Sequence, residues 1–433
     1  MLIQVLKNWA WLQHTQWLSR DQLESIQTKR LRDVVKHAYS TVPFYRQLYD
    51  STRSGEVSSI DYQTFTQIPL VTKSDFRRTV LKYRTADDAD TSACMPLTTS
   101  GSTGTPITIL IDPYAAAFRD ALNLRMLWSD GVRPFHKIYR SRGGLTERIE
   151  LQEGRAGEAG AWGFIKKRQY KLRLFSGNIQ DDLEFLSKWK PATLIAAGSY
   201  CKALARASEI YARPLKFKLV VATAEMLSKP TRELIAETFH AEVLDHYGIE
   251  EVGSIVWECP NHAGYHINTD SVLVEILQDG EPLPPGEIGE LYVTSFHQKA
   301  TPIIRYCTGD IGTTLEEQCP CGRGLTLMSK LQGRILNFIQ TPEGNYVAPT
   351  AIVGAIEDVR GIERFKVIQQ RDFSVEILLE MNEEATEDVM NDLKRRCKIL
   401  FGDLPISIKE IGKTYDQGKS KFSVIESRLL DNQ

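Results

Sequence analysis

The pattern of hydrophobic positions divides this chain of 433 residues into stretches of different secondary structure. Apolar residues at helical spacing, among them Leu23 and Leu31, predict helices over residues 1–60, with an interruption at Pro43. Between 192 and 248, short β-branched runs alternate with amphipathic stretches. This alternation predicts a parallel or mixed sheet with helices outside it.

From about residue 270 the pattern changes to strands without intervening helices. Residues 271–277 and 289–294 are apolar, β-branched runs separated by Gly- and Pro-containing turns. They predict a β-subdomain over about 255–332. The last hundred or so residues combine strand patterns with a helical pattern over 384–400, which is typical of a small α+β domain.

We therefore expect an α/β fold with two domains. The large N-terminal domain, residues 1–333, is expected to contain mixed sheets, flanking helices and the β-subdomain. The small α+β C-terminal domain is expected to span 334–433. A chain of this length is long enough for two or three domains with substantial cores.

Composition and charge narrow the classes of function. Hydrophobic residues make up 42%, charged residues 25%, and the net charge is −2, so nothing in the balance favours nucleic acid as a partner. No apolar run is long enough for a membrane span, and the N-terminus does not resemble a signal peptide. Seven cysteines, an odd number, favour a reducing compartment with free thiols or a metal site. We expect a cytoplasmic protein with small-molecule partners. The sequence leaves open whether the protein forms a homodimer.

Nine small, hydroxylated or Pro residues occur in a row at 98–106, directly before an apolar, β-branched run at 107–111. Backbone N–H groups and hydroxyls in such a loop can surround phosphate oxygens. The loop is not a P-loop, because no lysine follows its second glycine, Gly104. The alternative is an ordinary surface loop.

Two acidic positions follow predicted strands or turns. Glu251 comes just after the strand at 243–248, where a carboxylate can hold Mg²⁺ against phosphates, and Tyr247 offers a flat face to a purine. The alternative is a helix N-terminus with acids that complement its dipole. Asp310 follows a predicted turn at Gly309, where a carboxylate suits a ribose diol or, alternatively, a local Asx turn.

Taken together, the motifs resemble those of one superfamily. TTSGSTGTP, YGIEE, RYCTGD and GR occur in order, with a Gly-Lys near the C-terminus. The chain resembles the adenylate-forming (acyl-CoA synthetase-like) superfamily and, within it, the phenylacetate–CoA ligase family and its capsule-biosynthesis relatives. VPFYR at 42–46, IPLVTKSDFR at 68–77 and CPCGR at 319–323 carry the narrower resemblance.

The resemblance implies that the chain activates a carboxylic acid with ATP, forming an acyl-AMP and releasing pyrophosphate. Transfer of the acyl group to coenzyme A is then expected. One alternative is transfer to an amine acceptor in polysaccharide or natural-product biosynthesis. Another is a degenerate nucleotide-binding protein without catalysis.

The resemblance also implies roles for individual residues. The phosphate-binding set is Thr99, Ser100, Gly101, Ser102, Thr103 and Gly104. The adenine and ribose set is Thr223, Ala224, Glu225, Tyr247, Gly248, Asp310 and Arg334. Glu251 is expected to bind Mg²⁺, and Lys419 to bridge the carboxylate and the α-phosphate, with Lys421 as the competing lysine.

The chain departs from the family pattern at two places. Relatives have two acids in the hinge after Gly-Arg, whereas this chain reads Ile-Leu-Asn at 335–337. The Ser/Gly loop has no lysine of its own, so the catalytic cation is expected to come from the C-terminal domain.

A separate group of metal-ligand residues comprises Cys259, His266, Cys319 and Cys321. Three thiolates and one imidazole would make a closed, structural zinc site. His262 is the alternative histidine, and the resemblance favours His266 because Gly-x-His at the start of a strand recurs in relatives. The alternative to a metal site is a set of free thiols.

Overall fold

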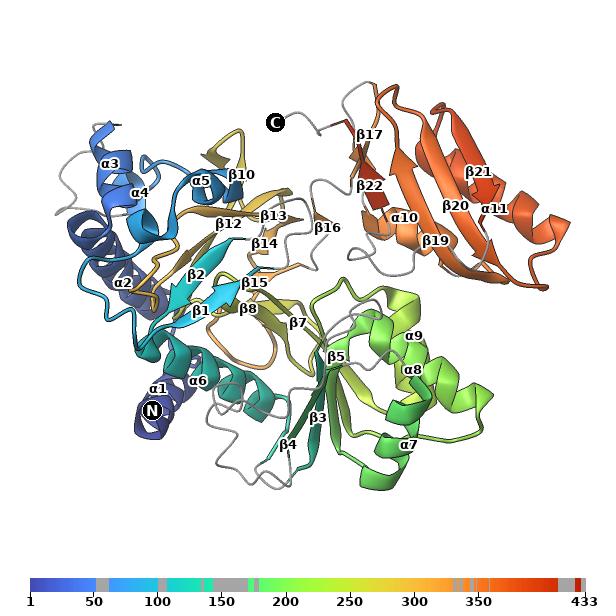
Figure 1. Cartoon of the computed structure of the whole chain (residues 1–433), viewed down its shortest axis with the longest axis horizontal. Helices are drawn as coiled ribbons and strands as arrows, with labels where there is room; N and C mark the ends of the chain where they lie inside the picture. Colours follow the sequence, from blue (N-terminus) through green and yellow to red (C-terminus); the bar gives the residue numbers. More distant parts are fainter. Residues whose placement is uncertain are drawn as a thin grey trace.

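The computed structural model of the chain describes residues 1–51, 62–99, 107–133, 136–142, 170–174, 179–329, 333–334, 338–342, 346–347, 349–357, 359–411 and 425–429. Figure 1 shows a larger body of sheets and helices and a smaller body formed by the C-terminal residues. Among the described residues, no helix has the length and apolar character that crossing a membrane requires.

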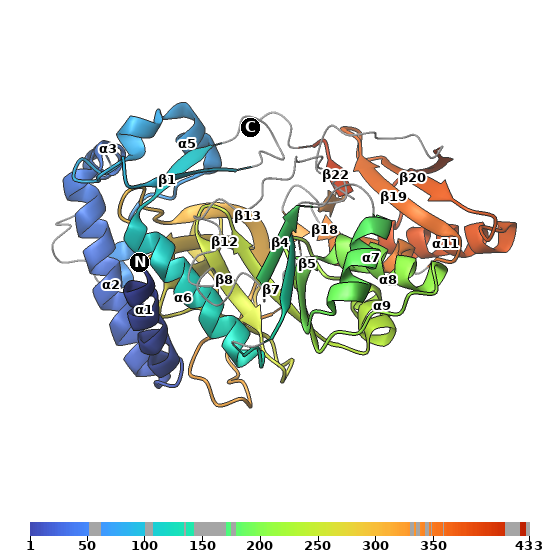
Figure 2. The same ribbon diagram turned by 60° about the horizontal axis from the view of Figure 1, so that its bottom comes forward.

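Helices cover the sheets of the larger body on several sides (Figures 1 and 2). They are α1 (Leu2–Thr15), α2 (Arg20–Thr41), α3 (Pro43–Ser51), α4 (Tyr62–Phe65), α5 (Lys73–Arg78), the 3₁₀ helix η2 (Leu81–Arg84), α6 (Pro113–Ser129), α7 (Ile179–Trp189), α8 (Gly198–Ile210) and α9 (Lys229–Phe239). The interruption predicted at Pro43 is the start of α3, as expected for Pro in a first helical turn. Thr72 caps α5 through a reciprocal capping box with Asp75.

The main sheet has nine strands in the order β14-β15-β9-β8-β7-β6-β5-β3-β4. The bounds are β3 (Ile138–Arg142), β4 (Tyr170–Leu174), β5 (Thr193–Ala197), β6 (Leu219–Thr223), β7 (Glu242–Ile249), β8 (Gly253–Glu258), β9 (Tyr265–Ile267), β14 (Thr314–Leu315) and β15 (Leu327–Met328). Strands β4, β3, β5, β6 and β7 are parallel, and the remaining pairs are antiparallel. The predicted mixed sheet with flanking helices is thus confirmed.

A second sheet of five strands has the order β11-β10-β12-β13-β16. Its strands are β10 (Val272–Gln278), β11 (Glu281–Pro282), β12 (Gly289–Ser295), β13 (Tyr306–Gly312) and β16 (Gly333–Arg334). The turn predicted before Asp310 is wrong, because Gly309 and Asp310 lie inside β13. Gly309 has φ +77°, and the β12–β13 pairing shifts register nearby, so the local irregularity is accommodated within a strand.

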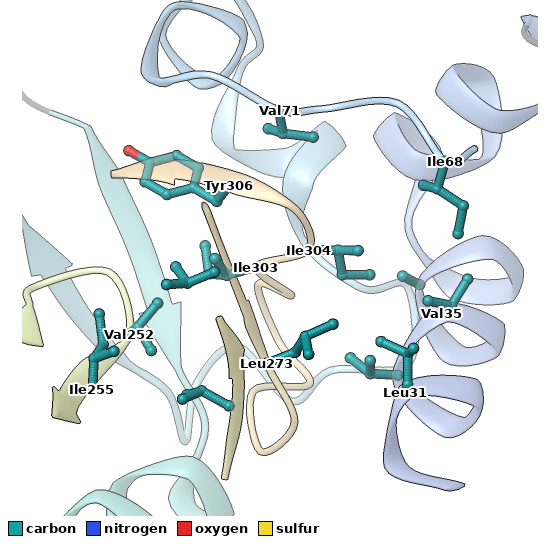
Figure 3. Packing of buried hydrophobic residues seen from close by; sticks show 14 of the residues in the cluster. Leu31, Val35, Ile68, Val71, Val252, Ile255, Leu273, Ile303, Ile304 and Tyr306 are labelled. Atoms are coloured by element: carbon teal, nitrogen blue, oxygen red, sulfur yellow. The ribbon is translucent and has the colours of Figure 1, made fainter. Parts of the chain in front are cut away.

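One hydrophobic core joins α2, the five-stranded sheet and the segment before α5. In Figure 3, Leu31 and Val35 of α2 face Leu273 and Ile304, and Tyr306 lies beside Val71. The backbone of Val71 also bonds to both neighbours of Tyr306, Arg305 and Cys307. This packing holds the start of α5 against β13.

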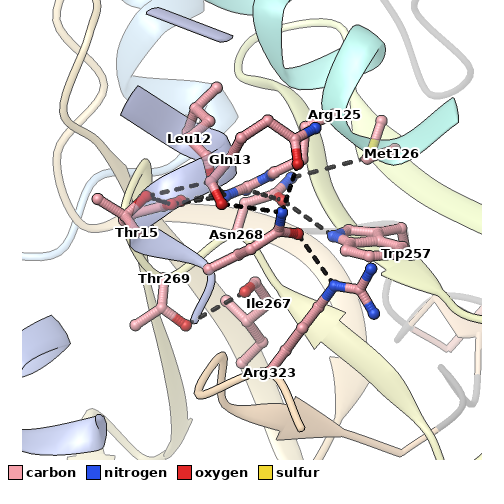
Figure 4. A network of polar contacts seen from close by, with 12 residues as sticks. Leu12, Gln13, Thr15, Arg125, Met126, Trp257, Ile267, Asn268, Thr269 and Arg323 are labelled. Carbon is pink, nitrogen blue, oxygen red and sulfur yellow. Dashed lines mark hydrogen bonds and ion pairs between the residues drawn. The ribbon is translucent and has the colours of Figure 1, made fainter. Parts of the chain in front are cut away.

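A buried polar network fixes α1 and α6 to the sheets (Figure 4). Arg125 is fully buried, and its guanidinium donates to Asp270 Oδ2 at 2.5 Å and to Asn268 Oδ1 at 2.6 Å. The Thr15 hydroxyl also donates to Asp270, and the Trp257 indole N–H also donates to Asn268. Because the ion pair is hydrogen-bonded from several sides, its burial is compensated.

The C-terminal residues form their own hydrophobic core between a four-stranded sheet and two helices. The sheet consists of β19 (Ile362–Gln369), β20 (Val375–Met381), β21 (Ile406–Glu410) and β22 (Ile425–Ser427), and the helices are α10 (Pro349–Ile356) and α11 (Glu387–Phe401). Two short strands, β17 (Ile339–Gln340) and β18 (Tyr346–Val347), pair separately. The α+β content expected here is confirmed.

Candidate functional site

The carboxyl ends of parallel strands β5, β6 and β7 lie side by side, with Ala197, Thr223 and His246 in register. Ala224 follows Thr223 with φ +69°, a left-handed conformation that is costly for a residue with a Cβ. Glu225 then accepts a hydrogen bond of 3.0 Å from the N–H of Ser199, at the start of α8. The segment predicted to lie at adenine is therefore at the sheet edge where ligands of α/β sheets bind.

Tyr247 and Asp310, far apart in the sequence, meet directly. The Tyr247 hydroxyl donates to Asp310 Oδ2 at 2.5 Å and connects β7 of the main sheet to β13 of the second sheet. The backbone of Arg334 pairs with that of Asp310 across β13 and β16. At Gly248 a Cβ would lie 2.2 Å from the carbonyl oxygen of Gly253, so only glycine fits there.

The carboxylate of Glu251 is buried in the turn between β7 and β8, with 5% of the residue exposed. Its Oε1 accepts a hydrogen bond of 3.0 Å from the Tyr306 hydroxyl and lies 3.5 Å from the Lys73 ammonium. Burial, and secondarily Glu251, raise the pKa of Tyr306, so its phenol stays a donor. The alternative of a helix N-terminus at 250–251 is excluded, because a strand hairpin occupies this position.

Lys73 is the residue that the sequence argument missed. It is the first residue of α5 and brings a cation to Glu251 from the N-terminal part of the chain. The larger body thus supplies a cation of its own to Glu251. The expectation that the catalytic cation comes from the C-terminal domain stays a prediction, because Lys419 lies outside the described residues. The only sequence signal was its place in IPLVTKSDFR, directly after the capping Thr72.

The main chain of the Glu251 turn is held from behind by two side chains. Arg119 of α6 donates to the carbonyl oxygens of Glu250 at 3.2 Å and Glu251 at 2.8 Å. Gln298 donates to the Glu251 carbonyl at 2.9 Å. Burial lowers the pKa of Arg119 to about 10, which leaves it charged at neutral pH. The turn is thus fixed at both its backbone and its carboxylate.

The Ser/Gly loop joins two strands, β1 (Met95–Thr98) and β2 (Thr108–Ile111), that pair as an antiparallel hairpin. Thr99 and Ile107 close its base, with hydrogen bonds of 2.9 Å from Thr99 N to Ile107 O and of 3.2 Å from Ile107 N to Thr99 Oγ1. Residues 100–106, the hinge at 335–337, Lys419 and Lys421 lie outside the described residues.

The structure also brings together Cys259, His266, Cys319 and Cys321, whose ligand atoms all lie within 4.8 Å of one another. The Sγ atoms of Cys259 and Cys319 are 3.6 Å apart, and Cys321 Sγ is 3.4 Å from His266 Nε2. His262 lies elsewhere, with its two ring nitrogens on the carboxylates of Glu258 and Glu242. The cluster connects the end of β8, β9 and the loop between β14 and β15.

The protonation tendencies of this cluster differ among its members. Burial lowers the pKa of His266 to about 4, so its imidazole is neutral and free to act as a ligand at pH 7. Burial raises the pKa of Cys259 to about 12 and also raises that of Cys319. Burial opposes ionisation of Cys321 too, but hydrogen bonds from Arg323 lower its pKa. The thiols of this cluster lie close together, and Arg323 is the cation next to them. Such a set of donor atoms is the kind that Zn²⁺ binds.

These features define the class of protein to which the chain is similar. The structure brings together Tyr247, Glu251 and Asp310, which come from motifs far apart in the sequence, where the two sheets meet. No protein-family model matches the sequence. The chain is 26% identical to phenylacetate–coenzyme A ligase of Thermus thermophilus over 395 residues, 87% of this chain and 86% of that protein. It is 24% identical to protein CapK of Staphylococcus aureus over 399 residues, 88% and 84% of the two chains. The predicted resemblance is confirmed.

Solved structures confirm the expected fold class. The chain superposes on 2-hydroxyisobutyryl-CoA ligase in the postadenylation state with 2-HIB-AMP at a TM-score of 0.77, with 19% identity, covering 94% of this chain and 90% of the other. With the same ligase in its thioesterification state the TM-score is 0.63, covering 95% and 91%. The TM-score is thus higher for the postadenylation structure than for the thioesterification structure.

Proposed function

We propose that this chain is an ATP-dependent, AMP-forming carboxylate ligase. The observation that carries the proposal is the hydrogen bond between Tyr247 and Asp310, together with the buried Glu251 carboxylate, which contacts Tyr306 of the same strand β13. It supports the proposal because an aromatic ring suits adenine, a carboxylate acceptor suits ribose hydroxyls and a buried carboxylate suits Mg²⁺. In the proposed reaction a substrate carboxylate oxygen attacks the α-phosphorus of ATP, and the bond to the pyrophosphate oxygen breaks.

Different residues of the large domain are proposed to bind the adenine, the ribose, Mg²⁺ and the phosphates. Thr223 to Glu225 and Tyr247 are proposed to bound the adenine, and Asp310 and Arg334 to bind the ribose. Glu251 fits Mg²⁺, because its buried carboxylate already faces a cation, the Lys73 ammonium. Bound Mg²⁺ would neutralise charge on the phosphates of ATP. Lys73 adds a second positive charge at this site, and the loop from Thr99 to Gly104 is proposed to bind the β- and γ-phosphates.

Pyrophosphate–ATP exchange in the presence of aryl, fatty and amino acids is the direct test of the proposal. We expect exchange that depends on Mg²⁺ and on at least one acid of the panel, because adenylation is reversible before acyl transfer. ATP without any acid is the control. ATP binding without exchange for any acid would contradict the ligase assignment and favour a nucleotide-binding protein.

The second step is proposed to transfer the acyl group to coenzyme A. We propose that residues 1–333 form the adenylating domain and that residues 334–433 form a mobile C-terminal domain carrying Lys419. The separate core of the described C-terminal residues supports this division. Coenzyme A consumption with an acid that supports exchange distinguishes a thioester product from transfer to an amine.

We further propose that Cys259, His266, Cys319 and Cys321 hold a structural zinc ion. Four ligands leave no open position for catalysis. The loop that carries Cys319 and Cys321 also contacts the α1–α2 corner, where Arg323 donates to Gln16 at 2.9 Å. The metal would therefore fasten this loop to the main sheet. Thiolate ligands persist in a reducing compartment, and we place the protein in the cytoplasm.

Purified protein should contain one zinc per chain by elemental analysis. Replacing Cys319 and Cys321 together with Ser should remove the metal and lower Tm by about 5–10 °C, because metal binding contributes to folding free energy. Cys94→Ser, outside the cluster, is the matched control and should leave both quantities unchanged. Protein prepared without chelator that contains no metal would overturn the zinc assignment.

A further inference from the structure

Glu357 lies at the end of α10 in the C-terminal body and reaches across to the larger body. Its carboxylate accepts hydrogen bonds from Lys202 of α8, from Ser228 and, at 2.7 Å, from Thr231 of α9. The side chains of Glu357 and Lys202 are 12% and 22% exposed. A carboxylate with three donors from another body is a specific contact and not a solvated surface charge.

The receiving surface is suited to an anion. Ser228 is the N-cap of α9, and its Oγ accepts the Thr231 N–H while its O–H donates to Glu357. The positive end of the α9 dipole and the Lys202 ammonium both face the carboxylate. Burial opposes ionisation of Glu357, yet hydrogen bonds from Lys202 and Ser228 hold its pKa below the ordinary value.

The contact joins the two bodies in the arrangement that this structure has. The superposition described above is better with the postadenylation state of 2-hydroxyisobutyryl-CoA ligase than with its thioesterification state. Figures 1 and 2 both place the C-terminal body next to α8 and α9 in this chain. A contact confined to one of two arrangements stabilises that arrangement relative to the other.

We propose that Glu357 is a positioning residue that holds the C-terminal body against α8 and α9 during carboxylate activation and releases it for acyl transfer. This inference rests on the proposed function for its two half-reactions. In this proposal Glu357 does not contact a substrate. It acts by holding the C-terminal body, to which Lys419 is assigned, against α8 and α9. Lys202, Ser228 and Thr231 form its docking site.

Glu357→Ala in the full chain should lower acid-dependent pyrophosphate–ATP exchange by about tenfold, because the activating arrangement becomes less populated. Transfer from a synthetic acyl-adenylate of the same acid to coenzyme A should stay within about twofold of wild type. Combining it with Lys202→Met should add little to the loss, since both changes remove one interaction. Glu384→Ala removes an exposed carboxylate paired with Arg360 inside the C-terminal body, and it is the matched control.

Amide hydrogen exchange supplies a readout that does not depend on activity. In Glu357→Ala, the amides of residues 228, 229, 231 and 232 should exchange hydrogen faster, while those of β19 and β20 stay as in wild type. The proposal would be overturned if Glu357→Ala slowed both half-reactions equally. It would also be overturned if amide hydrogen exchange at the start of α9 did not change. Absence of pyrophosphate exchange in the wild type would instead contradict the proposed function, and the hydrogen exchange would still decide whether Glu357 docks the C-terminal body.

Discussion

Glu251→Gln should reduce acid-dependent pyrophosphate–ATP exchange by about 100- to 1,000-fold, because the proposed Mg²⁺ ligand loses its negative charge. Glutamine has nearly the shape of glutamate, and its carbonyl oxygen can still accept the hydrogen bond from Tyr306. The hydrogen bonds from Arg119 and Gln298 are to backbone oxygens and are unaffected. We therefore expect a folded protein with an impaired chemical step.

The control for this prediction is the neighbouring Glu250→Gln. Glu250 is exposed and has the same charge and size, so the exchange rate should change by less than about twofold. A titration with Mg²⁺ should show a higher half-saturating concentration for Glu251→Gln alone. Wild-type exchange and an unchanged Mg²⁺ titration in Glu251→Gln would show that Glu251 is not the metal ligand.

Lys419→Ala should lower the exchange rate by about 1,000-fold while ATP binding, measured calorimetrically, stays within about threefold of wild type. The reason is that a cation between the carboxylate and the α-phosphate stabilises charge that accumulates mainly in the transition state. This role comes from the sequence motif, since Lys419 is outside the part of the chain that the structure describes.

Lys421→Ala is the control, with the same charge removed two residues further on. If Lys421→Ala and not Lys419→Ala loses exchange, the assignment of the two lysines is reversed. Lys73→Met adds a third comparison, since Lys73 also brings a positive charge to the site. A loss of ATP affinity in Lys73→Met, without one in Lys419→Ala, would separate phosphate binding from transition-state stabilisation.

Local sequence was sufficient for most elements of the fold. Within the alternation predicted between 192 and 248, α9 (Lys229–Phe239) is one of the expected helices, because Ser228 caps it and apolar positions repeat at helical spacing. The strand predicted at 243–248 is β7 within a few residues, and β6 is another of the strands expected in this alternation. Strand β1 was missed, since Met95 to Thr98 is short, contains Pro and is mostly exposed.

The ordered motifs also placed the site residues that the structure then brought together. Tyr247 and Asp310 are 63 residues apart in sequence and hydrogen-bonded in space. The sequence proposed a shared nucleotide site for them only through the resemblance. No periodicity indicates that β7 and β13, from two different sheets, meet at these positions, because sheet order and packing are not encoded at local spacing.

The sequence by itself determined the fold class, the relationship to phenylacetate–CoA ligases, the cysteine–histidine group and the Ser/Gly loop. The tertiary structure alone decided that Lys73 pairs with Glu251, that His266 and not His262 lies with the three cysteines, and that Glu357 docks on α8 and α9. The physical reason is range. Propensity, capping and turn chemistry act over a few residues, whereas these pairings depend on how buried surfaces pack across the whole chain.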